Sequence, residues 1–210
     1  MSPDQSKPPG TQRLPLTLKI LFPGLVVLWA IVYWNTHGPQ NFLWFCDLAN
    51  LVIAYGVVIE SPLILSSQAV SVLLVQALWM IDVLGRSLAG IHLIGGTEYM
   101  FNPAIPLPLR LLSLYHVVVP VVLVWVMLRL GYDRRGWLLQ TGVAWVVLPL
   151  SLWLTEPARD INWVHGLFGR PQSLVAPPIY FAALMIGYPV VLYFPTHLVL
   201  RRLFPEPDER

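Results

Sequence analysis

Residues 42–59 read FLWFCDLANLVIAYGVVI, an apolar segment that carries a thiol, a carboxylate and an amide near its start. These groups belong to Cys46, Asp47 and Asn50, and Cys46 is the only cysteine of the chain. An ionisable side chain in a segment apolar enough to cross a membrane is costly, which makes it a candidate for function. On a helix, Cys46 and Asn50 share one face because they are four residues apart, and Asp47 lies beside them. The stretch therefore predicts a membrane-spanning helix with a polar site near its beginning.

The composition of the whole chain also indicates a membrane protein. Of the 210 residues, 56% are hydrophobic and only 11% are charged, whereas about 25% of the residues of a soluble domain are charged. The mean hydropathy is +0.65. A net charge of +2 gives no indication of a nucleic-acid partner, and one cysteine cannot form a disulfide within the chain. We expect an integral membrane protein with membrane lipids as partners and no cofactor, and the pattern leaves its oligomeric state open.

Five further apolar segments are long enough to cross a hydrocarbon core of roughly 30 Å. The six predicted spans are Thr17–Trp34, Phe42–Ile59, Leu63–Leu84, Leu109–Leu130, Trp137–Leu154 and Pro178–Leu200. We predict an all-α, polytopic membrane bundle of six transmembrane helices over residues 17–204, with a polar, proline-rich tail at 1–16 and a second tail at 205–210. A cleaved signal peptide is the rival interpretation of the first span, but no small-residue cleavage site follows it.

Basic residues predict how the bundle sits in the membrane. With six spans, nine of the 13 Lys and Arg residues fall on one side and four on the other. Because basic residues concentrate in cytoplasmic loops, both termini are predicted to be cytoplasmic in a multi-pass protein of the cell membrane. Cys46 and His116 then lie about four and seven residues into helices that enter from the outer side. At 1.5 Å per residue, their depths differ by only ~5 Å.

Other polar residues gather at the predicted outer side. Asp82 and Arg86 are four residues apart near the outer end of the third span, so we expect them to pair along one helix face. The candidate binding residues at this side are Asn50, Asp82, Arg86, Arg110, Ser113, Asn162 and His165. Ordinary polar loops would account for the loop residues among them. They would not account for Asp47, Asp82 and His116, which lie within apolar segments.

Three interpretations of these groups stay open. Cys46 with His116 would give a nucleophile and a base, because a neighbouring base favours the reactive thiolate. A metal site would combine Asp47 or Asp82 with the histidines at positions 37, 92, 116 and 165, although no metal-binding spacing such as HExxH occurs. In a purely structural network, Asp82–Arg86 and Asp47 would tie helices together, at around 0.6 kcal/mol per contact on average.

Three short motifs resemble the YwaF-like family of small integral membrane proteins. Residues 43–49, LWFCDLA, resemble the opening of one of its helices, and residues 112–116, LSLYH, resemble its histidine-bearing helix. Residues 160–166, DINWVHG, resemble an outer segment of the family that precedes a proline and one last helix. The resemblance covers roughly residues 42–200 in the same order. Trp44 stands where the family has a histidine, and Trp163 stands where it has a tyrosine.

This resemblance implies a function in lipid chemistry. Animal relatives of the family transfer acyl chains between phospholipids, and a more distant six-helix group hydrolyses fatty-acid esters of hydroxy fatty acids. Both pair a nucleophile on an early helix with a histidine on a later one, which implies Cys46 as nucleophile and His116 as base. Asp47 or Asn50 would orient the histidine or hold the oxyanion. The expected function is acyl-chain transfer or hydrolysis; the alternative is a non-enzymatic protein for lipid binding, transport or an accessory role.

Overall fold

A computed structural model describes residues 14–167, 170 and 172–207, and every regular element within these ranges is helical. The α-helices are α1 (Leu16–His37), α2 (Phe45–Ile59), α3 (Pro62–Ala89), α4 (Leu107–Leu112), α5 (Tyr115–Leu130), α6 (Gly136–Leu154), α7 (Pro177–Gly187) and α8 (Phe194–Leu203). Short 3-10 helices join them, including η1 (Pro39–Leu43), η2 (Glu98–Phe101) and η4 (Ile161–Trp163), and a π-helix, η6 (Tyr188–Tyr193), joins α7 to α8. The prediction of an all-α helical bundle is confirmed.

Five segments are long and apolar enough to cross a membrane. They are Leu16–His37, Pro62–Ala89, Leu107–Leu130, Gly136–Leu154 and Pro177–Leu203. The remaining predicted span is the apolar helix α2, whose 15 residues extend about 22 Å at 1.5 Å per residue. The chain is therefore a multi-pass membrane protein. The second span is the shortest of the six because its first predicted residues, Phe42–Trp44, are not α-helical.

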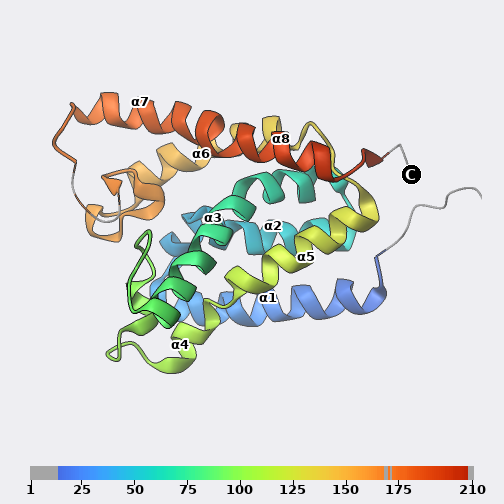
Figure 1. Ribbon diagram of the computed structural model, residues 1–210, viewed down its shortest axis with the longest axis horizontal. Coiled ribbons are helices and arrows are strands. Elements are labelled where there is room, and N and C mark those ends of the chain that lie inside the picture. The colour runs from blue at the N-terminus through green and yellow to red at the C-terminus, as the bar shows by residue number, and fades with distance from the viewer. Residues whose placement is uncertain (1–13, 168–169, 171, 208–210) are drawn as a thin grey trace, which may run out of the picture.

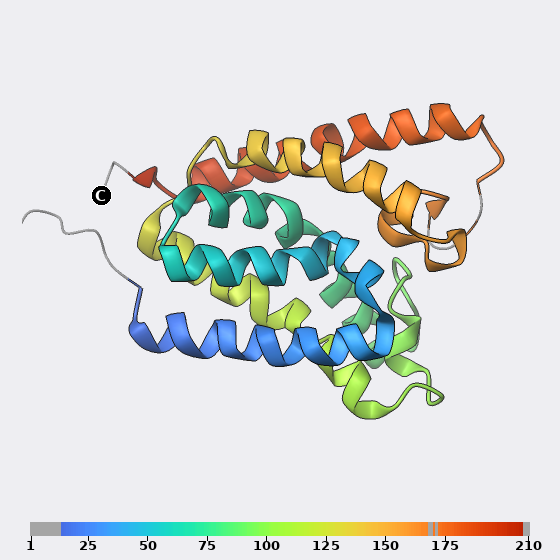
Figure 2. The same cartoon turned by 180° about the vertical axis from the view of Figure 1, so that it is seen from behind.

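Helix α3 runs through the middle of the bundle and packs against α2, α5, α6 and α8. Figures 1 and 2 show α1 along one side of this group and α7 with α8 along the opposite side. Both described ends of the chain lie at the same end of the bundle (Figure 1). We call this the inner end, and we call the opposite end, with residues 38–44, 90–106, 155–167 and 172–176, the outer end. Which end faces the cytoplasm stays a prediction.

Contacts at the inner end fix the two ends of the chain to the turns. Glu60 pairs with Lys19 and accepts a hydrogen bond from the backbone N–H of Leu14 at 3.0 Å. At the other turn, the N–H of Tyr132 donates to the carbonyl of Pro205 at 2.9 Å. Most of the predicted tails, residues 1–13 and 208–210, lies outside the described residues.

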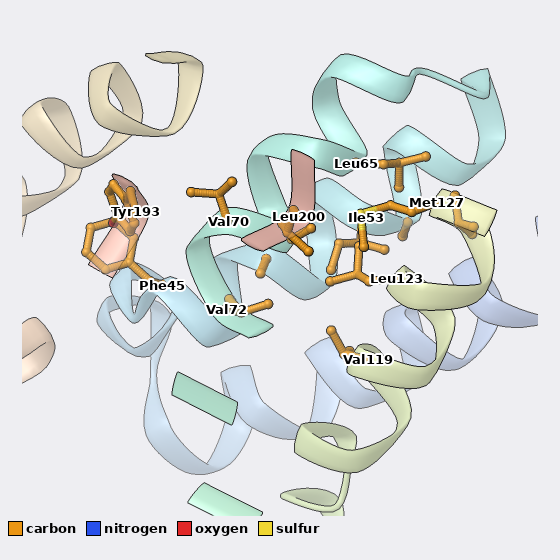
Figure 3. Close-up of a cluster of buried hydrophobic side chains, with 14 of the residues drawn as sticks. Phe45, Ile53, Leu65, Val70, Val72, Val119, Leu123, Met127, Tyr193 and Leu200 are labelled. Carbon is orange, nitrogen blue, oxygen red and sulfur yellow. The ribbon is translucent and has the colours of Figure 1, made fainter. Parts of the chain in front are cut away.

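The tight reversal between α2 and α3 has the conformation that its residues favour. Glu60 has a left-handed backbone with φ 53°, the Ser61 side chain accepts from the N–H of Ile64 at 3.4 Å, and Pro62 begins the next helix, where no N–H is needed. The two helices are close here, because a Cβ added at Gly56 would lie 3.1 Å from the Leu65 side chain. Figure 3 shows the apolar cluster that follows, with Ile53, Leu65 and Leu123 packed between helices.

Two predicted spans are interrupted in the structure. The fourth is broken at Ser113 and Leu114, which separate α4 from α5, and the sixth contains the wider π-helical turn η6. Neither break was predicted, because apolar composition continues through both. The first break lies beside the outer polar residues, and it turns them towards different neighbours.

Candidate functional site

Asp47 is the centre of a polar cluster at the outer end of the bundle. Its carboxylate accepts hydrogen bonds from Asn41 Nδ2 at 2.6 Å and from the Tyr115 hydroxyl at 2.6 Å. The side chain is buried, with 2% of the residue exposed. It lies in the first turn of α2, where the partial positive charge of the helix N-terminus favours a carboxylate. One residue thus connects η1, α2 and α5, as the structural interpretation of Asp47 expects.

Cys46 lies next to this carboxylate. Its Sγ is 4.0 Å from Asp47 Oδ1, which is the limit of a weak hydrogen bond from sulfur. Cys46 is half-buried, and its thiol is not part of a disulfide. A carboxyl group is therefore a polar neighbour of the predicted nucleophile.

The partners of the His116 ring are not those that the predicted pair requires. Its Nδ1 donates to the carbonyl of Ser113 at 2.8 Å, and its ring stacks between Trp79, at 4.6 Å, and Tyr115, at 4.1 Å between centroids. Within the described ranges, no hydrogen bond joins the imidazole to Cys46. The predicted hydrogen-bonded pair is absent because Tyr115, one residue earlier, is the α5 side chain that reaches α2.

The turns that carry Cys46 and His116 nevertheless meet, as expected from their similar depth. Tyr115 is adjacent in sequence to His116, Asp47 is adjacent to Cys46, and the two are hydrogen-bonded across the helices. Because a carbonyl oxygen can only accept, His116 Nδ1 carries the proton and Nε2 of the neutral ring keeps its lone pair. A thiol, a carboxyl, a phenol and an imidazole are thus gathered on facing turns of α2 and α5.

Arg110, Ser113 and His116 follow one another at intervals of three residues, but they do not form a single helix face, because the break before α5 separates them. Arg110 Nη1 donates to the carbonyl of Met100 at 2.9 Å, and the Ser113 hydroxyl lies 3.4 Å from the hydroxyl of Tyr33 on α1. Arg110 therefore holds η2 in place, whereas Ser113 connects α5 to α1.

Tyr99 on η2 closes the cluster from outside. Its hydroxyl accepts from Trp79 Nε1 at 3.1 Å. Burial raises the pKa of Tyr99 to about 12, so the group stays a neutral hydroxyl at physiological pH. It contributes hydrogen bonding without charge to the rim of the site.

The predicted Asp82–Arg86 pair is wrong. Asp82 is fully buried and accepts from the backbone N–H groups of Ile94 at 2.6 Å and Gly95 at 3.0 Å. His92 Nδ1, at 2.9 Å, and the hydroxyl of Thr97 complete its partners. Arg86 is exposed; it donates to the carbonyl of Gly90 and lies 5.9 Å from the ring centroid of Phe101.

The reason is the path of the chain after α3. Residues 91–97 fold back over the end of the helix and present two N–H groups and two side chains to the carboxylate. These donors satisfy Asp82 from the interior, while Arg86, one turn further on, points out of the bundle. Asp82 is an anchor for this loop, which is a structural role.

Asn162 also has a structural role in the fold. Its Oδ1 accepts from the N–H of Phe45 at 3.1 Å, and its Nδ2 donates to the carbonyl of Leu43 at 2.7 Å and to the Ser151 hydroxyl at 3.1 Å. The residue is 1% exposed and has φ 53°, a conformation that Asn tolerates better than most residues. It caps α2 and fixes the helix that carries Cys46 and Asp47.

The other predicted site residues are not joined to the Asp47 cluster by a hydrogen bond. Asn50 is 2% exposed, and its Nδ2 has no hydrogen-bond partner among the described residues. The buried Nε2 of His165 has no partner in the same part of the chain. The histidines and acidic residues of the described ranges form no group of three that could hold a metal ion. This leaves the metal interpretation without a site in that part of the chain.

Sequence reasoning missed the aromatic and loop partners of the site. Tyr115, Tyr33, Trp79 and Tyr99 all supply polar contacts, and none of them was among the predicted site residues. Tyr115 directly precedes His116 in the sequence, and this position was the one feature that could have indicated its contact with Asp47. Asn41 could not be linked to Asp47 without knowing that η1 folds against α2.

No family model, curated protein or solved structure matches the chain. The resemblance to the YwaF-like family therefore stays a prediction that rests on the three motifs.

Proposed function

We propose that this membrane protein handles the acyl chains of lipids at the outer cluster, with Cys46 as the residue that accepts the acyl group. The observation that supports this is the Asp47–Tyr115 hydrogen bond, which brings Cys46 and the α5 residues Tyr115 and His116 to one place. The apolar surfaces of the surrounding spans suit a substrate that enters from the bilayer. The resemblance to the YwaF-like family supports the same chemistry.

In this proposal, the sulfur of Cys46 bonds to the carbonyl carbon of a lipid ester, and the bond from that carbon to the ester oxygen breaks. The thiol proton passes to Asp47, or to His116 Nε2 after a side-chain rotation, and then to the departing oxygen. A neutral alcohol leaves, and a thioester stays on Cys46. Attack by water or by the hydroxyl of a second lipid, whose proton passes to the sulfur, releases a fatty acid or a new ester.

A non-enzymatic role is the second candidate, and a specific observation favours it. Asp47, Asp82 and Asn162 each hold two or more hydrogen bonds that tie neighbouring segments together. Such contacts need no reaction to explain them, and Cys46 would then be a small apolar residue of α2. In this case the protein would bind lipid, transport a solute or stabilise a larger assembly.

Acyl transfer to the thiol separates the two candidates. The purified protein in lipid nanodiscs would be incubated with a long-chain acyl thioester, and the intact mass of the protein would be recorded. The enzymatic proposal expects an added acyl group that is absent from Cys46→Ser and forms at least about tenfold more slowly in Asp47→Asn, because a general base contributes roughly 10²–10⁴-fold.

His116→Ala tests whether the imidazole takes part, and Tyr55→Phe is the control for an exposed aromatic residue on α2. Absence of acylation in the wild-type protein would contradict the enzymatic proposal and leave the structural network. Acylation at an equal rate in wild type, Asp47→Asn and His116→Ala would also contradict it, because the thiol would then react without help from either neighbouring base.

A further inference from the structure

A second polar network lies in the inner half of the bundle, away from the Asp47 cluster. Gln140 Nε2 donates to the Ser71 hydroxyl at 2.9 Å and to the Tyr193 hydroxyl at 3.4 Å. Gln68 Nε2 donates to Gln140 Oε1 at 3.3 Å and to the Ser67 hydroxyl at 3.0 Å. All five residues are buried. This inner network joins α3 and α6 to the π-helical turn η6.

Gln76 lies on α3 between the two polar regions. It is five residues outward from Ser71 and three residues inward from Trp79, which stacks on His116. At 1.5 Å per residue these separations are about 7 and 5 Å along the helix. Gln76 is thus the polar residue of α3 that is placed to connect the inner network with the outer cluster.

The amide of Gln76 is fully buried, and neither its Nε2 nor its Oε1 has a hydrogen-bond partner among the described residues. Asn50 on the adjacent helix α2 has a second buried, unpartnered amide nitrogen, Nδ2. A native protein rarely buries polar atoms without partners, and ordered water is the usual partner where protein groups are absent. Within a bilayer the same demand is stronger, because bulk water is excluded.

We propose that Gln76 binds ordered water inside the bundle, and that this water links the inner network to the outer cluster along α3. Each amide offers what a bound water needs, since Gln76 supplies one donor group and one acceptor group and Asn50 supplies a donor. Water is small enough to reach a site between tightly packed helices, whereas a lipid headgroup is not. An amide does not release or accept protons at physiological pH, so this is a binding site and not a proton relay.

Hydroxyl-radical footprinting by pulsed X-rays tests the proposal, because radicals formed from ordered water oxidise the side chains beside it. The full-length protein in nanodiscs would be exposed, and oxidation of residues 72–79 of α3 would be measured by mass spectrometry. We expect oxidation of this segment despite its burial, and a loss of about fivefold or more in Gln76→Leu, in which an apolar side chain cannot hold the water.

Gln68→Leu is the matched control, because Gln68 lies on the same helix and is already paired with Gln140 and Ser67. It should leave the oxidation of residues 72–79 unchanged. If the wild-type segment is not oxidised while the exposed residues Ile91, Leu93 and Ile94 are, the proposal is wrong, and this result needs no variant that folds. Oxidation that persists in Gln76→Leu would also overturn it, because Gln76 would not be the residue that holds the water.

Discussion

Replacing Tyr115 by Phe removes one hydroxyl and leaves the aromatic ring, so it isolates the hydrogen bond to Asp47. This bond is 2.6 Å long and its acceptor belongs to a residue that is 2% exposed. Hydrogen bonds to charged groups contribute ≈ 1.5–3 kcal/mol in water-soluble proteins. Polar contacts between membrane helices reach only about 1.7 kcal/mol, because the unfolded chain in the membrane also finds partners. We therefore expect Tyr115→Phe to lower the free energy of unfolding by about 1–2 kcal/mol.

The loss should not be larger, because Asn41 still donates to the same carboxylate at 2.6 Å. The assay is reversible unfolding in mixed detergent micelles, followed by helical circular dichroism as the denaturing detergent increases. Tyr55→Phe is the matched control, since Tyr55 is 59% exposed and its change should stay within about 0.5 kcal/mol. Asp47→Asn combined with Tyr115→Phe completes a double-mutant cycle.

The cycle decides whether the two residues act together. If they do, the double variant loses less than the sum of the two single losses, with an interaction energy of at least about 0.5 kcal/mol. If the two single losses of unfolding free energy add up to within about 0.3 kcal/mol of the loss in the double variant, the two residues do not act together. This result would mean that the carboxylate of Asp47 does not depend on Tyr115 and that α2 and α5 are held in register by apolar packing alone.

Three further predictions concern the loop anchor, the inner turn and the topology. Asp82→Asn should lower stability by about 2–4 kcal/mol, because a network of four donors to a buried carboxylate is broken; thermal unfolding measures it. The Arg135 side chain holds the pKa of Asp133 below its ordinary value of 3.8. This pair therefore stabilises the fold above pH 3.8, and the contribution is lost as pH falls through the lower pKa of the folded state. In Arg135→Ala, the unfolding midpoint should therefore fall less than in the wild type as the pH is lowered to 3. Reporter fusions after Pro39 and at the C-terminus should report opposite sides of the membrane.

Each of these predictions has an outcome that contradicts it. If Arg86→Ala destabilises the protein as much as Asp82→Asn, the loop is not the main partner of the carboxylate. If the Arg135→Ala variant shows the same acid dependence as the wild type, the Arg135 bond does not determine the titration of Asp133. If both reporters face the same side, an even number of spans lies between the two positions, and the six-span bundle is wrong.

The spans were predictable because their signal is local. A helix that crosses a membrane must be apolar over about 20 residues whatever surrounds it, so composition alone located five spans within a few residues. The reversal at Glu60-Ser61-Pro62 was equally local, since Ser caps and Pro begins the helix that follows it. The break at Ser113 and the π-helical turn η6 were not predictable, because both lie within apolar sequence and depend on the packing of neighbouring helices.

The partners of the polar residues were only partly predictable. Equal depth correctly brought residues 46–47 near residues 115–116, because depth follows from the helical rise and the number of residues from the membrane surface. It could not choose between Tyr115 and His116, which lie about 100° apart around the helix. For Asp82, the nearest opposite charge in sequence suggested Arg86, whereas the actual donors come from a loop whose path no local pattern encodes.

The sequence by itself determined that this is a multi-pass, all-helical membrane protein and where its polar residues lie along each helix. The tertiary structure decided which of those residues meet. The physical reason is that lipid and the protein interior are similarly apolar, so a membrane helix shows little difference between its buried and exposed faces. Its rotation about its own axis is then set by packing, and that rotation directed Tyr115 towards Asp47, stacked His116 on Trp79 and buried Gln76 between two networks.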